Sequence, residues 1–199
     1  MNMRRHDSRR EKRNQIIISM FIAAIMIFSI LGFIYGRDPT TNKIKYEINN
    51  RTYFFEKEYN TYSLTIDTNK VVFYTLPSDV DFNLTKLTMD RVKNSKMIYM
   101  TFDPGQEDLS YVDLVRFSLA EELLGFGIFI VGGVTEETDQ YQLPVVDCNN
   151  ATAFVPVIKF QNSNTTEINL KENCIIIKGK NFDFVKFRDL LLYKLYGVL

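Results

Sequence analysis

The most pronounced pattern in the chain is an apolar run close to its start. Residues 16–35 read IIISMFIAAIMIFSILGFIY and contain no charged residue and no proline. At about 1.5 Å per residue, such a helix extends about 30 Å, the thickness of a bilayer's hydrocarbon core. The pattern predicts a transmembrane helix over residues 15–36, followed by a short polar linker over 37–43 and one compact domain over 44–199.

Charge asymmetry predicts the orientation of this helix. The first thirteen residues carry six basic and two acidic side chains, whereas the part after the span carries 18 basic and 22 acidic ones. Because Lys and Arg beside a span resist translocation, we expect residues 1–14 to form a basic cytoplasmic tail without regular structure. A role in orientation is favoured over contact with anionic lipid or nucleic acid.

Two processing alternatives stay open. A cleaved secretory signal has an apolar region of about 7–15 residues and a small-x-small cleavage site. The run here is longer, and its best candidate, at residues 34–36, reads Ile-Tyr-Gly. A basic leader before an apolar helix also resembles archaeal pilin-type precursors, but residues 12–15 (KRNQ) lack the small residue before the cut. A retained single-pass anchor is favoured.

Alternating apolar and polar positions predict that the domain begins with antiparallel hairpins. The alternation covers residues 44–48, 52–56, 62–66 and 71–76. Asn49 and Asn50 tolerate a positive φ and predict a tight first turn. A second turn is expected over residues 67–70. These segments together predict a meander of three or four strands.

The middle of the domain has the pattern of a β-α-β unit. A short helix is expected near residues 85–94, then a strand over 97–102 and a helix from Ser110 to Gly125. One face of this helix carries Val112, Val115, Leu119 and Leu123. Ser110 and Asp113 have capping-box spacing. A strand over 128–131, ending at Gly132 and Gly133, should then lie parallel to the first strand.

The last third predicts strands over residues 154–160, 168–170 and 174–178, then a helix over 182–196. Two apolar rows on this helix indicate burial: Phe184, Phe187, Leu191 and Leu195, and Leu190, Leu192, Tyr193 and Tyr196. Membrane re-entry is disfavoured because charges interrupt the helix, namely Lys186, Arg188, Asp189 and Lys194. The expected class is a mixed α/β (α+β) fold.

The cysteines and the sequons both indicate a location outside the cytoplasm. Cys148 and Cys174 are the only two cysteines, which suggests a disulfide, with two buried free thiols as the alternative. A zinc site is disfavoured because the only histidine is His6. Four Asn-x-Ser/Thr sequons follow the span and offer glycosylation candidates, namely Asn50, Asn83, Asn150 and Asn164.

The sequence argues against several enzyme classes. A triad that uses histidine cannot operate in a domain without one, and the chain has no G-x-S-x-G elbow, phosphate loop or dinucleotide fingerprint. The carboxyl ends of the two parallel strands carry acidic groups that could bind calcium or act as paired carboxylates: Asp103, Glu107, Asp108, Glu136 and Glu137. Turn, helix-start and loop roles explain the same residues, so we expect no cofactor, metal or catalytic residue.

Three segments carry a resemblance to known proteins. MTFDPGQEDLSYVDLVRF, VDCNNATAFVPVIKF and NCIIIKGKNFDFVKFRDLLLYKLYGVL, together with the N-terminal span, resemble uncharacterised single-pass membrane proteins of small-genome archaea. This resemblance implies an archaeal cell envelope and no activity. The order of elements is also similar in topology to α/β segments of archaeal surface-layer proteins.

These observations favour a structural or interaction role in the cell envelope. We expect the lipid bilayer and a membrane or envelope protein as partners, and no nucleic acid. The alternatives are a carboxylate- or metal-dependent envelope hydrolase and an accessory subunit of a membrane complex. For the latter, Ala23, Ala24 and Gly32 offer a modest helix-packing surface.

Overall fold

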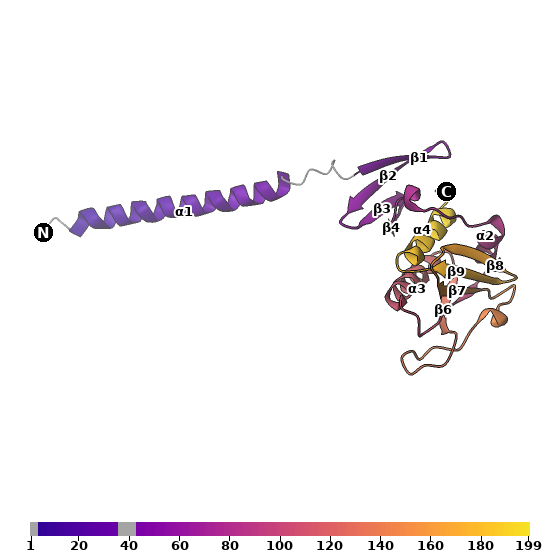
Figure 1. Cartoon of the computed structure of the whole chain (residues 1–199). Helices are drawn as coiled ribbons and strands as arrows, with labels where there is room; N and C mark the ends of the chain where they lie inside the picture. Colours follow the sequence, from indigo (N-terminus) through magenta and orange to yellow (C-terminus); the bar gives the residue numbers. More distant parts are fainter. Residues whose placement is uncertain (1–3, 36–42) are drawn as a thin grey trace. The chain divides into compact units, whose positions relative to one another are not determined.

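In the computed structural model, residues 4–35 and 43–199 are described. The chain divides into two compact units, Met1–Lys43 and Ile44–Leu199 (Figure 1). The predicted linker 37–43 lies outside the described residues except for Lys43, which begins the first strand.

The first unit contains one long helix, α1 (Arg4–Tyr35). The prediction that residues 1–14 lack regular structure is wrong from Arg4 onward, because α1 includes residues 4–14. These residues contain neither Gly nor Pro and are rich in Arg, Lys and Glu, which have good helix propensity. Once the apolar segment is helical, extending the helix backwards needs no new nucleation.

The second unit opens with a four-stranded antiparallel sheet, which confirms the predicted meander. Its strands, in spatial order, are β1 (Lys43–Ile48), β2 (Arg51–Glu58), β3 (Thr61–Ile66) and β4 (Asn69–Phe73). Asn49 and Asn50 have φ values of 52° and 60°, as the first predicted turn requires. The second turn is shorter than predicted, since Asn69 and Lys70 already pair with β3.

A five-stranded mixed sheet forms the centre of the domain. Its order is β6-β5-β7-β9-β8. The strands are β5 (Met97–Phe102), β6 (Phe129–Val134), β7 (Val157–Asn162), β8 (Glu167–Lys171) and β9 (Cys174–Gly179). All pairs are parallel except β8 with β9. Helix α3 (Leu109–Leu124) joins β5 to β6, which confirms the β-α-β unit.

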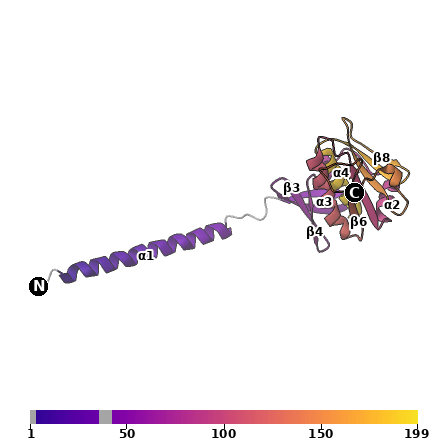
Figure 2. The same cartoon turned by 90° about the horizontal axis from the view of Figure 1, so that it is seen from below.

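Helices α3 and α4 (Asp183–Leu195) share one core with the sheet (Figures 1 and 2). The predicted inner face of α3 is fully buried. Apolar residues on the helix-facing side of the sheet complete this core: Ile98, Met100, Phe102, Ile158, Phe160, Ile175 and Ile177. The opposite side carries a smaller cluster around Val146, Val157 and Cys174. The helix expected near residues 85–94 is α2 (Lys86–Lys93).

Two predicted strand boundaries and one predicted capping box need correction. Strand β6 continues through Gly132 and Gly133 to Val134, and β7 begins at Val157 rather than at residue 154. The predicted capping box at the start of α3 does not form. Asp113 instead accepts a hydrogen bond from Arg116 at 2.7 Å and another from Tyr141 at 3.1 Å.

Candidate functional site

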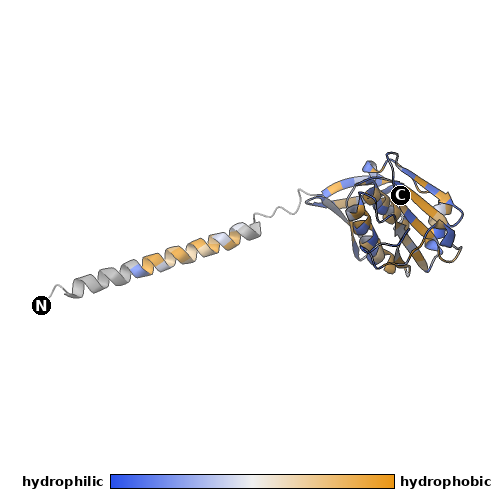
Figure 3. Ribbon diagram, turned by 60° about the horizontal axis from the view of Figure 1, so that its bottom comes forward, coloured by the Kyte–Doolittle hydropathy of each residue, from blue (hydrophilic) through white to orange (hydrophobic). Residues whose placement is uncertain are grey.

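The apolar part of α1 has the features of a membrane-spanning or signal helix. Over Gln15–Gly32 none of the residues is buried, and large side chains are open along its length, with Phe28 73% and Phe21 67% exposed. Figure 3 shows this stretch as a continuous apolar segment of the helix. A helix that is apolar all round needs an apolar environment, which a bilayer supplies. By length and composition, one such helix near the N-terminus fits either assignment.

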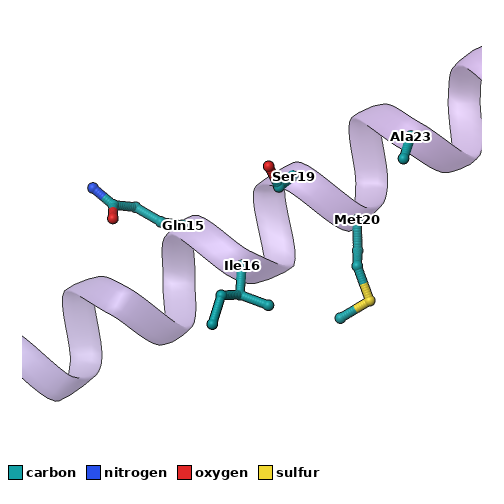
Figure 4. Close-up of a pocket in the computed structure, with 5 residues that line it drawn as sticks. All are labelled: Gln15, Ile16, Ser19, Met20 and Ala23. Atoms are coloured by element: carbon teal, nitrogen blue, oxygen red, sulfur yellow. The ribbon is translucent and has the colours of Figure 1, made fainter.

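A surface depression on α1 lies between the side chains of Gln15, Ile16, Ser19, Met20 and Ala23. Figure 4 shows that all five come from successive turns of this one helix. Every lining residue belongs to this one helix, so the depression is the ordinary groove between neighbouring side chains of a helix. We assign it no ligand.

The carboxylates named as candidates do not form a site. Asp103, Glu107 and Glu136 are exposed, and Asp103 Oδ1 accepts a hydrogen bond from the Gly105 N–H at 2.8 Å, as in an ordinary turn. Asp108 is buried and accepts a hydrogen bond from Asn162 Nδ2 at 3.2 Å. Across residues 4–35 and 43–199, no group of three or more His, Cys, Asp or Glu side chains could hold a metal ion.

The sheet nevertheless has the strand order at which α/β proteins often bind ligands. The chain leaves β5 toward β6 on one side and later returns to β7 on the other, so β5 and β7 flank a topological switch point. Here the loop after β5 is acidic, with Asp103, Glu107 and Asp108, which disfavours a phosphate at the start of α3. The hydrogen bond between Asp108 and Asn162 joins the loop after β5 to the end of β7.

At the carboxyl end of β6, a polar cluster holds the loop that follows the strand. Arg116 pairs with Asp113, and Tyr141 packs edge-on against Phe102 with ring centroids 5.1 Å apart. Burial and the hydrogen bond to Asp113 raise the pKa of Tyr141. A Cβ at Gly132 would come within 2.5 Å of Arg116 Nη1, so glycine lets the arginine lie over the strand. These contacts position a loop, although Arg116 Nε is buried without a hydrogen-bond partner.

The predicted disulfide is present. Cys148 and Cys174 are joined with a Cα–Cα distance of 5.2 Å across a sequence separation of 26 residues. The sequon asparagines Asn50, Asn83, Asn150 and Asn164 are all exposed. Their exposure is compatible with glycosylation, which stays a prediction.

Sequence reasoning missed a buried polar cluster that joins α4 to the four-stranded sheet. Asp189 is 0% and Arg188 3% exposed, and their side chains pair at 2.8 Å. Asp189 Oδ2 accepts hydrogen bonds from the N–H groups of Tyr74 and Thr75 and from Thr75 Oγ1, at 2.7–2.8 Å. Burial raises the pKa of Asp189, and the Arg188 guanidinium opposes that shift.

The rest of this cluster fixes α4 against α3 and β4. Arg188 donates to Ser118 Oγ at 2.8 Å and to the Val72 carbonyl, and it lies over the Tyr74 ring. Tyr193 donates to the Thr75 carbonyl at 2.6 Å and stacks on Phe73. Every group therefore has a structural partner, and the cluster is closed to solvent. We interpret it as the structural link between the two sheets.

Alkaline pH is expected to weaken the fold through Tyr193 of α4 and Tyr196, which caps the C-terminal end of this helix. Burial raises the pKa of Tyr193 far above the usual value of about 10 and that of Tyr196 to about 12. Above pH 10 the unfolded chain loses phenolic protons that the folded chain keeps. The free energy of unfolding should therefore fall as pH rises, by up to about 1.4 kcal/mol per pH unit for Tyr193, and by less for the partly exposed Tyr196.

Urea titrations of the full chain between pH 9 and 11 would measure this slope. Tyr193→Phe should flatten it, whereas Tyr59→Phe, at a 98% exposed tyrosine, should leave it unchanged. Equal slopes for the two variants would contradict the assignment to Tyr193.

Comparisons with known proteins do not identify a family for this chain. No protein-family model matches the chain, no curated protein matches it, and no solved structure matches its fold. The function is therefore argued from this chain's own residues.

Proposed function

We propose that this protein is a single-pass membrane protein whose disulfide-bonded α/β domain has a structural or interaction role outside the cytoplasm. The observation that carries the proposal is the apolar Gln15–Gly32 segment of α1, none of which is buried. Outside a bilayer, its side chains would leave a large apolar surface in water, at a cost of about 25 cal/mol per Å². The disulfide supports an oxidising location for the domain.

The orientation in this proposal has the N-terminus inside. The basic residues of the first thirteen positions support it, because positive charge next to a span is retained on the cytoplasmic side. An archaeal cell envelope is proposed on the resemblance of the sequence alone. An envelope protein as partner, with the span as an assembly element of a larger complex, is part of the same proposal.

The hydrolase alternative has no observation in its favour. Its candidate acids Asp103, Glu107 and Glu136 are all exposed. A catalytic carboxyl pair needs two acids in one cleft with different environments. We therefore do not propose a catalytic function.

Membrane fractionation tests the proposal directly. The full chain should stay with the membranes after carbonate extraction, and deletion of residues 15–32 should release it.

Protease added to intact cells should digest the domain and spare the N-terminal tail. Replacing the tail's arginines and lysines with asparagine should reduce the fraction with that orientation. A freely soluble full-length chain would overturn the anchoring, and a mature chain that begins near residue 36 would show a cleaved signal instead.

A further inference from the structure

The outer surface of α3 and the start of β6 carry an unusual density of exposed apolar side chains. Five large residues within 16 positions are 38–66% exposed: Leu114, Phe117, Leu124, Phe126 and Phe129. Leu114, Phe117 and Leu124 share one face of α3, opposite its buried residues. We call these five residues the α3–β6 patch. Such clusters mark interaction surfaces in soluble domains.

The strand beside this patch is an open sheet edge. Of the four edge strands in the two sheets, β1, β4 and β8 carry charged side chains, whereas β6 reads FIVGGV and has none. Charges on edge strands prevent pairing with another chain. Strand β6 is therefore the one edge among the described strands without that protection.

Along the outer edge of β6, hydrogen bonds to the backbone of another segment are seen only at the C-terminal residue, Val134. The Val134 N–H donates to the Pro144 carbonyl at 3.0 Å, and the Val146 N–H donates to the Val134 carbonyl at 2.8 Å. Pro144 has no N–H, so this pairing cannot extend back to Gly132. Because backbone groups alternate along a strand, the N–H and C=O groups of Ile130 and Gly132 face the same open side as those of Val134.

We propose that the partner bound at this surface is a second copy of the same chain. A two-fold axis at Val131 would pair Ile130 of one copy with Gly132 of the other, which satisfies the outward backbone groups of both. Side chains alternate along β6, so Gly132 faces Arg116 of α3, whereas Phe129, like Gly133, faces the other side of the sheet. The same contact therefore brings the α3 residues of the two patches together on one side and places Phe129 beside the paired strands on the other. This inference rests on the interaction role proposed above and gives that role a partner.

Buried area favours a second copy. With about 200 Å² for a free large side chain, the patch presents about 500 Å² per copy, so a dimer buries about 1,000 Å² before the backbone contact is added. That approaches the range of about 1,200–2,000 Å² for stable interfaces. Neither α3 nor β6 has an exposed Lys or Arg, which disfavours docking on an anionic bilayer.

Cysteine cross-linking of the full chain in its membranes tests this geometry. Val131→Cys adds the only free thiol, because both native cysteines are already paired. Across an antiparallel pair, the two Cβ atoms at the axis lie about 5 Å apart, so a mild oxidant should link most of the protein as dimer. Tyr59→Cys, at a 98% exposed position on the other sheet, controls for random collision.

Charge substitutions then test the patch. In the Val131→Cys background, Phe117→Glu with Phe129→Glu should abolish the cross-linked dimer. Phe154→Glu, at an 85% exposed phenylalanine elsewhere, should leave it intact. Tyrosine circular dichroism would check that each variant is folded.

Each outcome decides the proposal. Cross-linking of Val131→Cys no greater than that of Tyr59→Cys overturns it, as does linkage to a different protein or a dimer that survives both glutamates. Carbonate extraction of the same samples separates this result from anchoring. A monomer that stays in the membrane refutes only the dimer, and a soluble dimer refutes only the anchor.

Discussion

Asp189→Ala is expected to lower the free energy of unfolding by about 3–5 kcal/mol, because it leaves a buried guanidinium without its carboxylate. Arg188 is 3% exposed, and its next carboxylate, Glu122, is 3.7 Å away. The substitution also removes the acceptor for the N–H groups of Tyr74 and Thr75, which are two of the hydrogen bonds that join the end of β4 to α4.

Urea unfolding of the full chain in detergent micelles, followed by tyrosine circular dichroism, would measure this loss. The matched control is Asp81→Ala. Asp81 also pairs with a basic residue of α4, Lys186 at 3.5 Å, but its side chain is 75% exposed, so the expected loss is below about 1 kcal/mol. Equal losses for the two variants would show that the buried pair is not the link between the sheets.

A double variant separates the buried charge from the packing. Arg188→Met with Asp189→Leu removes both charges and keeps apolar volume. It should be more stable than Asp189→Ala, since no unpaired charge is left inside the protein. If the double variant is the less stable of the two, the hydrogen bonds to β4 contribute more than the ion pair does.

The elements with a clear local period could be predicted from the sequence. The buried row Val112, Val115, Leu119 and Leu123 has helical spacing, and the Asn49–Asn50 turn uses residues that accept a positive φ. The disulfide followed from cysteine number and expected location. For the helix face and the turn, neighbouring residues contain the information. For the disulfide, only one pairing of two cysteines is possible.

The buried Arg188–Asp189 pair could not be predicted in this way. In the sequence these residues interrupt an apolar helix, and charges usually mark the solvent face. The decisive partners, Thr75 and Val72, lie more than 110 positions away along the chain. One signal was present: Leu190, Leu191, Leu192 and Tyr193 are consecutive, so α4 is buried on several sides, and Arg188 and Asp189 just before them are buried with it.

The structure does not bring the candidate carboxylates together, for a related reason. Its strands were identified correctly, and Asp103 does follow the carboxyl end of β5. Side-chain exposure depends on loop packing, which the sequence does not encode locally. Gly132 and Gly133 were likewise interpreted as a strand end, although a Cβ there would meet Arg116 at 2.5 Å and Val146 at 3.2 Å. Glycine fits inside this strand because other side chains lie directly against it.

Reducing the Cys148–Cys174 bond is expected to destabilise the domain by about 3 kcal/mol, since a cross-link over this separation restricts the unfolded chain. The bond also ties the segment before Cys148 to β9. That segment covers the second side of the sheet, where the Val146 carbonyl accepts a buried hydrogen bond from Thr101 at 2.6 Å and Asp147 pairs with Lys159 at 2.8 Å. Hydrogen exchange should therefore rise first over residues 143–150.

Urea midpoints with and without reductant would measure the effect. In Cys148→Ala with Cys174→Ala, reductant should change nothing, and an equal shift in that variant would assign the effect to the reagent.

The same thiols also report on location, because disulfides persist in oxidising compartments and are rare in the cytosol. In intact cells both cysteines should resist alkylation until reductant is added. Thiols that are alkylated at once would place the domain on the reducing side of the membrane and contradict the proposed orientation.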